Sequence, residues 1–295
     1  MSKRVMVIGA TGVLGRPAVA RLLDAGYSVS GLARSEPRLE AVRATGAEPV
    51  AGDLFSTSSL VTALRGHDAV LNLATRIPQK MTRASAWAAN DQVRVSGSAA
   101  LAAAVRQVDS VRTVVQEGIS FVYADGGAAL LTEDAPLRPG RVTASSVTAH
   151  ANVAALTDRT VVRLRIGTLV GPDAMTSALL AAARRGGPLI LGSRSDWTTA
   201  IHPSDAAAAA VAALEAPSGV YNVGAPPVLK GDLGAALASA AGVRHARALP
   251  KWLVSRIPLA EPMGRSQRVD SGKLMAATGW KCERPTPGPD WFTED

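Results

Sequence analysis

The 295 residues suffice for one large α/β domain or for a domain with a smaller appendage, and a composition of 47% hydrophobic and 19% charged residues is that of a folded globular protein. The net charge of +8 does not predict nucleic-acid binding, because the basic residues are spread along the chain without interleaved aromatic residues. No apolar run is long enough for a membrane helix, and a single cysteine, Cys282, excludes an internal disulfide, so we expect a cytoplasmic protein without a metal site.

The first predicted element is the apolar run Val5–Ile8, which passes directly into a turn with three glycines. A run rich in β-branched residues predicts a strand buried on both faces, and the apolar spacing that follows predicts a helix. Strand, glycine turn and helix together predict a dinucleotide site: Gly9 permits the tight turn, Gly12 lets the backbone approach a pyrophosphate, and Gly15 lets the helix pack on the strand. The alternative interpretation is an ordinary turn of small residues. The predicted cofactor-binding residues here are Gly9, Thr11, Gly12, Val13, Leu14 and Gly15.

A second strand is predicted over Ser28–Arg34, and its end indicates which dinucleotide binds. Proteins that prefer NAD usually place an acidic residue about 20 residues after the glycines, where it holds the ribose 2′-hydroxyl. Arg34 stands at this point instead, and an arginine can pair with a 2′-phosphate and stack on the adenine. We therefore predict NADP as the cofactor, with Arg34 and Arg38 at its adenosine end. Glu36 keeps NAD open as the alternative.

The form Gly-Ala-Thr-Gly-Val-Leu-Gly at the start of the chain resembles the extended and atypical short-chain dehydrogenase/reductases, the NAD(P)-binding proteins similar to epimerases and dehydratases. A third strand is predicted over Ala47–Leu54. The resemblance implies that Asp53 and Leu54 at its end flank the adenine. The alternative is that Asp53 caps the helix that begins near Thr57.

A fourth strand is predicted over His67–Thr75. The resemblance implies that its last residues pass under the ribose and diphosphate, which adds Leu73, Ala74 and Thr75 to the cofactor-binding set. A long Ala-rich helix is predicted over residues 84–106, and Asn90 within it matches a position that often supports the active site in the family.

The resemblance weakens after the predicted fifth strand, Val111–Ser120, which we expect to continue through the following residues as far as position 127. Family members carry a catalytic Ser or Thr just before a Val-Tyr-Gly signature. Here the signature is matched around Tyr123, but the hydroxyl positions hold Gly118 and Ile119. Ser120 is the nearest hydroxyl, and a shift of one residue along a strand turns a side chain to the other face.

The catalytic Tyr-x-x-x-Lys motif of the family is absent from the sequence, and its two positions hold Val142 and Ser146. In the family the Tyr exchanges a proton with substrate, and the Lys lowers the pKa of that Tyr. Three interpretations stay open: hydride transfer with another proton donor, cofactor binding without turnover as in NmrA-like regulators, and a non-redox reaction. The alternative to catalysis is a structural role for each residue, with Tyr123 packed in the core and His150 on the surface of a helix. The candidate catalytic residues are Ser120, Tyr123, Ser146 and His150.

The second half repeats the order of elements expected from the resemblance. A sixth strand is predicted over Thr160–Gly167, and the resemblance places Gly167 beside the nicotinamide. It also places His202 near the substrate cleft, while Asp205 is explained by helix capping alone. The Pro-rich end from Pro285 predicts an extended, mobile segment.

These observations predict a doubly wound parallel sheet (Rossmann fold) with a small C-terminal substrate-binding lobe. The dinucleotide domain would span residues 1–170, with strand residues also from 219–224, and the lobe would lie mainly in 171–295. The predicted function is NADPH-dependent reduction of a small organic carbonyl compound in specialised metabolism, with a non-standard proton donor. The predicted partners are a small-molecule substrate and, at most, a second copy of the chain.

Overall fold

The computed structural model describes residues 2–78 and 83–292. In this part of the chain seven parallel strands form one sheet in the order β12–β7–β5–β4–β1–β2–β3. The order runs outward from β1 in one direction and from β4 in the other, so the predicted doubly wound α/β fold is confirmed. The strands are β1 (Arg4–Ile8), β2 (Ser28–Ala33), β3 (Glu48–Ala51), β4 (Ala69–Asn72), β5 (Thr113–Gln116), β7 (Thr160–Ile166) and β12 (Gly219–Val223).

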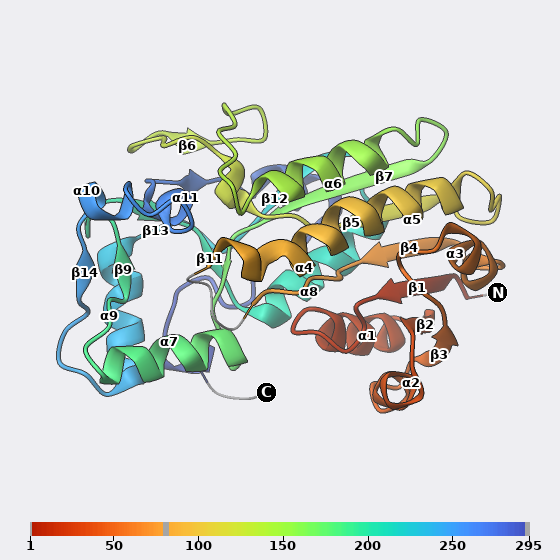
Figure 1. The fold of residues 1–295 in the computed structure, drawn as a ribbon, viewed down its shortest axis with the longest axis horizontal. Coiled ribbons are helices and arrows are strands. Elements are labelled where there is room, and N and C mark those ends of the chain that lie inside the picture. The colour runs from red at the N-terminus through yellow and green to blue at the C-terminus, as the bar shows by residue number, and fades with distance from the viewer. Residues whose placement is uncertain (1, 79–82, 293–295) are drawn as a thin grey trace.

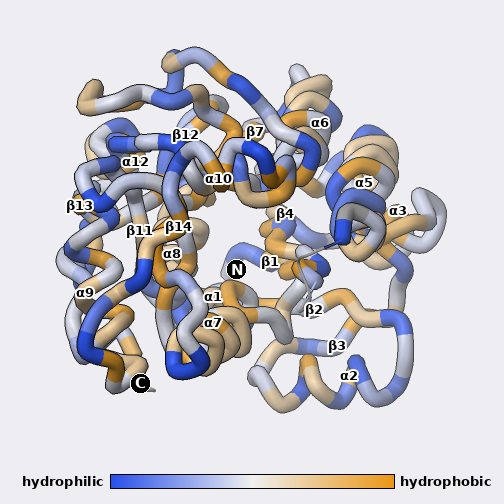
Figure 2. The backbone as a smooth tube through the Cα atoms, turned by 60° about the vertical axis from the view of Figure 1, so that its left-hand side comes forward, coloured by the Kyte–Doolittle hydropathy of each residue, from blue (hydrophilic) through white to orange (hydrophobic). Residues whose placement is uncertain are grey.

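Helices cover both faces of the sheet (Figure 1). Successive side chains of a strand point to opposite faces, so Val5 and Val7 pack into one apolar layer, and Met6 and Ile8 into the other. Figure 2 shows that strongly hydrophilic stretches lie mainly in the outer loops. The first layer includes residues of α1 (Gly15–Asp24), α2 (Glu36–Arg43), α8 (Pro203–Ala212) and α12 (Gly272–Thr278), and the second includes α3 (Thr57–Leu64), α5 (Ser98–Val105) and α6 (Ala144–Ala154).

The C-terminal part adds short strand pairs and helices beyond the carboxyl ends of the sheet strands. The pairs are β8 (Thr168–Leu169) with β11 (Ala200–Ile201), β9 (Ile190–Leu191) with β14 (Ala248–Leu249), β10 (Trp197–Thr198) with β13 (Val228–Leu229), and β6 (Leu130–Leu131) with β15 (Arg268–Val269). The helices are α7 (Ala174–Arg184), α9 (Lys230–Ala241), α10 (Lys251–Val254) and α11 (Glu261–Gly264). The chain returns from this part to the sheet through β12, as the sequence predicts.

Three elements differ from their prediction. The fifth strand ends at Gln116, and the chain then turns into the 3₁₀ helix η3 (Ser120–Val122) instead of continuing extended. The predicted helix 84–106 is divided into η1 (Ala84–Trp87), α4 (Ala88–Gln92), the π-helical η2 (Val93–Gly97) and α5. The Pro-rich end is not extended, because η5 (Pro289–Phe292) buries Trp291 completely.

Candidate functional site

The turn between β1 and α1 requires glycine at both ends for steric reasons. Gly9 has φ of +90°, and a Cβ there would lie 2.9 Å from the backbone nitrogen of Ala74. A Cβ on Gly15 would lie 2.0 Å from the carbonyl oxygen of Gly9. The exposed Gly12 donates its N–H to that same oxygen at 3.0 Å, which closes the turn. The loop therefore presents backbone, with little side chain, at the N-terminus of α1, which is the geometry that accommodates a diphosphate.

The other three positions of the predicted set in this turn lie at its surface. Thr11 and Leu14 are partly exposed, and Val13 is 46% exposed. Residues 11–14 of the loop are therefore accessible at the carboxyl end of β1. No acidic side chain stands in the first turn of α1, so nothing there repels an anion.

Arg34 follows β2 and faces the residues that follow β3. Its Nη1 lies 3.8 Å from Asp53 Oδ1, and its guanidinium lies 5.7 Å from the ring centre of Phe55. The Arg34 and Asp53 side chains are 58% and 43% exposed, so this ion pair contributes little free energy and a phosphate can replace the carboxylate as partner. Phe55 was not among the predicted residues. Arg38 is exposed on α2.

The capping alternative for Asp53 is wrong, because Ser56 is the residue that caps α3. The Ser56 hydroxyl accepts the backbone N–H of Ser59 at 3.3 Å. Asp53 instead accepts the N–H of Phe55 at 3.1 Å, which fixes the turn that carries both side chains. Leu54, between them, is buried in the core layer of α3 and α5.

The residues after β4 lie directly against the glycine turn. Leu73 donates its N–H to the oxygen of Ile8 at 2.9 Å, and Ala74 is the residue that leaves no room for a Cβ on Gly9. Thr75 is exposed at the end of this segment. Asn90 reaches the following residue and accepts the N–H of Arg76 at 2.9 Å. The structure therefore brings Leu73 and Ala74 against the glycine turn, with Thr75 exposed after them.

A buried ion pair, missed by the sequence interpretation, underlies the end of β5. Arg94 Nε and Nη2 donate to the two carboxylate oxygens of Glu117 at 3.0 and 2.9 Å. Both side chains are almost fully buried, at 2% and 4% exposure. Arg94 lies in the π-helical turn η2, where the altered helix pitch accompanies this inward-pointing side chain. The two residues are 23 positions apart, so no local pattern indicated the pair.

The space for a catalytic hydroxyl at position 118 is occupied by the ring of His150. A Cβ on Gly118 would lie 2.3 Å from His150 Nε2 and 2.7 Å from the oxygen of Leu164. At the next position, the N–H of Ile119 donates to Ser146 Oγ at 3.2 Å. The glycine and the histidine thus form one packing unit, with Ser146 held beside it.

Ser120 and Tyr123 are both inside the protein. Ser120 is 2% exposed in η3, and its carbonyl oxygen accepts the N–H of Tyr123 at 3.1 Å. Tyr123 is fully buried; its hydroxyl donates to Asn222 Oδ1 at 2.6 Å and accepts from Arg165 Nη1 at 2.7 Å. Burial raises the pKa of the Tyr123 hydroxyl, although Arg165 opposes this shift. This geometry favours a packing role for Tyr123.

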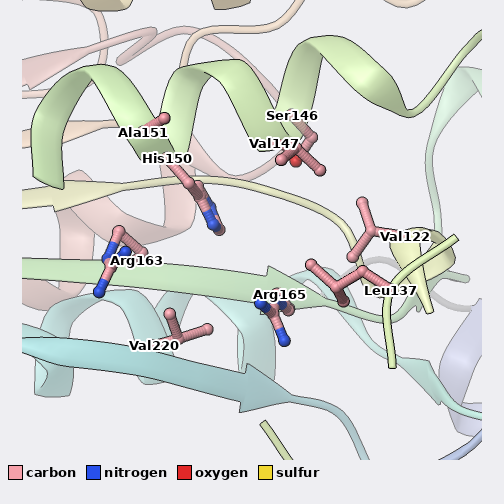
Figure 3. Close-up of a pocket in the computed structure, with 9 residues that line it drawn as sticks. All are labelled: Val122, Leu137, Ser146, Val147, His150, Ala151, Arg163, Arg165 and Val220. Carbon is pink, nitrogen blue, oxygen red and sulfur yellow. The ribbon is translucent and has the colours of Figure 1, made fainter. Parts of the chain in front are cut away.

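Ser146 and His150 line a cavity of about 210 Å³ between α6 and the strands β7 and β12 (Figure 3). Its polar lining consists of these two residues with Arg163 and Arg165. Burial, with the nearby charges of Arg165 and Arg163, lowers the pKa of His150 to about 3, so the imidazole is neutral near pH 7. The apolar lining comes from Val122, Leu137, Val147, Ala151 and Val220. Ser120 and Tyr123 do not line it.

Gly167 stands where the chain leaves β7 for the C-terminal part. A Cβ there would lie 2.5 Å from the oxygen of Thr199, so this crossing requires glycine. His202 caps α8, with its ring nitrogen accepting the N–H of Ser204. The capping prediction for Asp205 is wrong, because His202 is the cap and the Asp205 carboxylate accepts instead the backbone N–H groups of Glu283 and Arg284 at 2.8 and 3.0 Å. Asp205 therefore anchors the C-terminal segment.

Two kinds of feature are absent from residues 2–78 and 83–292. Within them, no three His, Cys, Asp or Glu side chains come together as a metal site. No helix in the same part of the chain has the length and apolar character to cross a membrane.

Comparisons with known proteins bear on the family and the fold of this chain. Residues 5–224 match the model of the NAD dependent epimerase/dehydratase family. The chain is 31% identical over 301 residues to a 3-diazoavenalumate denitrifying reductase of a Streptomyces species, covering 96% of this chain and 97% of that one. It is also 31% identical over 138 residues to the 4-hydroxy-2-methyl-3-oxo-4-farnesyl-3,4-dihydroquinoline-1-oxide ketoreductase of Stigmatella aurantiaca, covering 47% and 40% of the two chains.

Among solved structures, the human epimerase family protein SDR39U1 (isoform 2) with NADPH superposes with a TM-score of 0.79 at 22% identity, covering 97% of this chain and 96% of that one. MoeE5 in complex with UDP-glucose and NAD superposes with a TM-score of 0.74 at 24% identity, covering 95% and 93%. At these identities the likeness establishes the fold.

Proposed function

The chain belongs to the NAD-dependent epimerase/dehydratase family, and on this premise we propose that it is an NADPH-dependent reductase that delivers hydride to a small organic acceptor. The two relatives described above are named as reductases, which supports an oxidoreductase of the short-chain dehydrogenase/reductase type. The choice of NADPH and of the acceptor rests on residues of this chain.

The cofactor would lie across the carboxyl ends of β1, β2 and β4. The glycine loop 9–15 fits the diphosphate, since side chains at Gly9 and Gly15 would collide with backbone and close the cradle. Arg34 and Arg38 would pair with the 2′-phosphate, and Asp53 and Leu54 would lie near the adenine. Residues 73–75 would lie under the ribose, and Gly167 would lie beside the nicotinamide. NADPH supplies a hydride when bound.

The acceptor is indicated by the missing proton donor. Val142, at the position of the family tyrosine, is 4% exposed, and Ser146 stands at the position of the lysine. Gly118 and Ile119 stand where the family hydroxyl is expected. Reduction of a carbonyl group requires a proton for the developing alkoxide, which a positioned acid normally supplies. An acceptor that already carries positive charge requires no such acid.

We propose an arenediazonium compound as this acceptor. Hydride adds to the terminal nitrogen, converting the cation Ar–N≡N⁺ into the neutral diazene Ar–N=N–H while NADPH becomes NADP⁺. The C–N bond then breaks, N₂ leaves, and the hydrogen that was on nitrogen ends on the ring carbon. No proton enters or leaves in the sum of these steps. The Streptomyces relative supports a diazonium acceptor, because its name gives a diazo compound as substrate and a denitrifying reduction as reaction.

Carbonyl reduction is the second candidate, and the Stigmatella ketoreductase favours it. Its proton would come from Ser146, Ser120, Tyr123 or His150. The pKa of about 3 leaves His150 without a proton to donate as an imidazolium near pH 7. Tyr123 is already hydrogen-bonded to Asn222 and Arg165. Among these candidates, Ser146 stands at a position of the family's Tyr-x-x-x-Lys motif, that of the lysine.

The test follows NADPH absorbance in the presence of benzenediazonium, with the same mixture lacking protein as a control. We expect protein-dependent loss of NADPH with equal amounts of N₂ and of the arene that has lost its nitrogen. Turnover of ketones but not of the diazonium would establish the second candidate. Tight NADPH binding without turnover of either class would identify a redox-silent sensor or scaffold.

Gly12→Asp provides the loss-of-function variant for this test. Its carboxylate would stand in the exposed loop where the diphosphate lies, so NADPH binding and turnover should both be lost. Ala25→Asp is the matched control, because it adds the same charge at the exposed opposite end of α1. Equal NADPH affinity in wild type and Gly12→Asp would refute the location of the cofactor.

We also propose that residues 1–170 and 219–224 form the cofactor domain and that 171–295 mainly form the substrate lobe. The protein would act in the cytoplasm, in specialised metabolism, on a small molecule and as a monomer or homodimer. Size-exclusion chromatography with light scattering tests the last point.

A further inference from the structure

Two positively charged side chains line the cavity behind α6. Arg163 and Arg165 are two residues apart on β7, so their side chains lie on the same face of the sheet. Within residues 2–78 and 83–292, neither guanidinium has a carboxylate at ion-pair distance. Arg165 donates to the Tyr123 hydroxyl and to the backbone oxygen of Glu133, at 2.7 and 2.8 Å. The Glu133 carboxylate accepts the N–H of Asn222 instead.

Arg163 is the less satisfied of the two. Its Nε is buried and makes no hydrogen bond in the described part of the chain. Burial and the neighbouring Arg165 lower the pKa of the Arg163 guanidinium. A partly buried charge without a partner is costly, and an anionic ligand would remove this cost.

The remaining walls define what kind of anion fits. His150 Nε2 also lacks a partner in the described residues, and this neutral ring can donate or accept one hydrogen bond but cannot neutralise the arginines. Figure 3 shows Val122 and Leu137 at one end and Val220 below, so the interior is lined largely by aliphatic side chains. The cavity is therefore cationic on its β7 side, carries the neutral polar groups of Ser146 and His150 on its α6 side, and is aliphatic elsewhere.

We propose that this cavity binds a small carboxylate with a compact apolar body, such as a benzene ring. A guanidinium presents parallel N–H groups that match the two oxygens of a carboxylate. An apolar cavity of about 150 Å³ holds benzene in another protein, and this cavity measures about 210 Å³. The cavity is separate from the glycine loop that fits the diphosphate, because β5 and β4 lie between β7 and β1 in the sheet.

The binding test uses benzoate on the full-length protein, by isothermal titration calorimetry with and without saturating NADPH. We expect saturable binding at millimolar or lower concentration in both cases. Benzamide has the same shape without the charge. It should bind at least about tenfold more weakly than benzoate, because it cannot make the charge-assisted hydrogen bonds that contribute about 1.5–3 kcal/mol. Displacement of benzoate by NADPH, or tighter binding of inorganic phosphate than of benzoate, would overturn the proposal.

Two variants locate the site. Arg163→Gln should weaken benzoate binding about tenfold or more, while Arg185→Gln, which removes the same charge from an exposed position after α7, should leave it unchanged. Ala151→Phe should block the cavity from the exposed edge of α6, with no loss of charge. Unaltered benzoate affinity in both Arg163→Gln and Ala151→Phe would overturn the proposal even if one variant folded poorly.

The carboxylate could belong to the substrate itself or to a separate ligand, and inhibition kinetics distinguish the two. If it is the acid group of the substrate, benzoate should compete with 4-carboxybenzenediazonium. If it is a separate ligand, benzoate should leave the KM of that compound unchanged. Binding by calorimetry does not depend on turnover, so a failure of the proposed reductase activity would leave this site intact.

Discussion

Gly118→Ala should destabilise the fold, because an added Cβ has no room at the end of β5. The atom would lie 2.3 Å from His150 Nε2 and 2.7 Å from the backbone oxygen of Leu164. Leu164 is held in β7 opposite Tyr221 of β12, so its backbone oxygen cannot withdraw freely. Overpacking an interior lowers the free energy of unfolding by about 1–3 kcal/mol. Because the new Cβ would contact backbone, we expect a loss of about 3 kcal/mol for this variant.

Thermal unfolding followed by circular dichroism measures this effect. For a chain of this size, a loss of about 3 kcal/mol lowers the unfolding midpoint by about 6 °C. Gly272→Ala is the control, because its nearest atom is a movable carboxylate oxygen of Asp270 at 3.2 Å. That variant should change the midpoint little. A Gly118→Ala midpoint within about 1 °C of wild type would refute the steric explanation of why a glycine stands here.

A double variant separates the two contacts. His150→Ala removes the ring and leaves the Leu164 oxygen in place, so Gly118→Ala should cost about 1 kcal/mol less in the His150→Ala background than in wild type. Identical costs in the two backgrounds would show that the histidine does not determine the residue at 118.

Three further outcomes are expected. Arg34→Asp should weaken NADP binding at least about tenfold and NAD binding much less, by calorimetry; equal losses would contradict pairing with a 2′-phosphate. Arg94→Met should lower the free energy of unfolding in urea by about 3–5 kcal/mol, because it leaves the Glu117 carboxylate buried and unpaired, whereas Arg94→Met with Glu117→Leu should cost far less. Burial lowers the pKa of His150 to about 3, so the unfolded chain binds a proton at higher pH than the folded protein, and the free energy of unfolding should fall as pH drops from about 6.5 toward 3. The urea midpoint should therefore fall less between pH 7 and pH 5 in His150→Gln than in wild type. An identical fall would contradict a neutral buried ring.

The sequence alone determined the parts of this protein that depend on neighbouring residues. Val5–Ile8 and the glycines after it specify a strand, a turn and a helix within about 20 residues, and each requirement is local in the backbone. The absence of a Tyr-x-x-x-Lys motif is likewise visible in the sequence. The doubly wound order followed because strands alternate with helices along the chain.

The tertiary structure alone decided what fills the space left by the missing motif. His150 and Gly118 are 32 positions apart, and Arg94 and Glu117 are 23 apart, yet each pair is in contact because α6 and η2 pack beside the end of β5. The Pro-rich end was predicted to be extended because its own residues favour that form, but Asp205 binds the backbone at 283 and 284, and the core accepts Trp291. Contacts between distant segments depend on how helices and strands pack, and no local pattern encodes that packing.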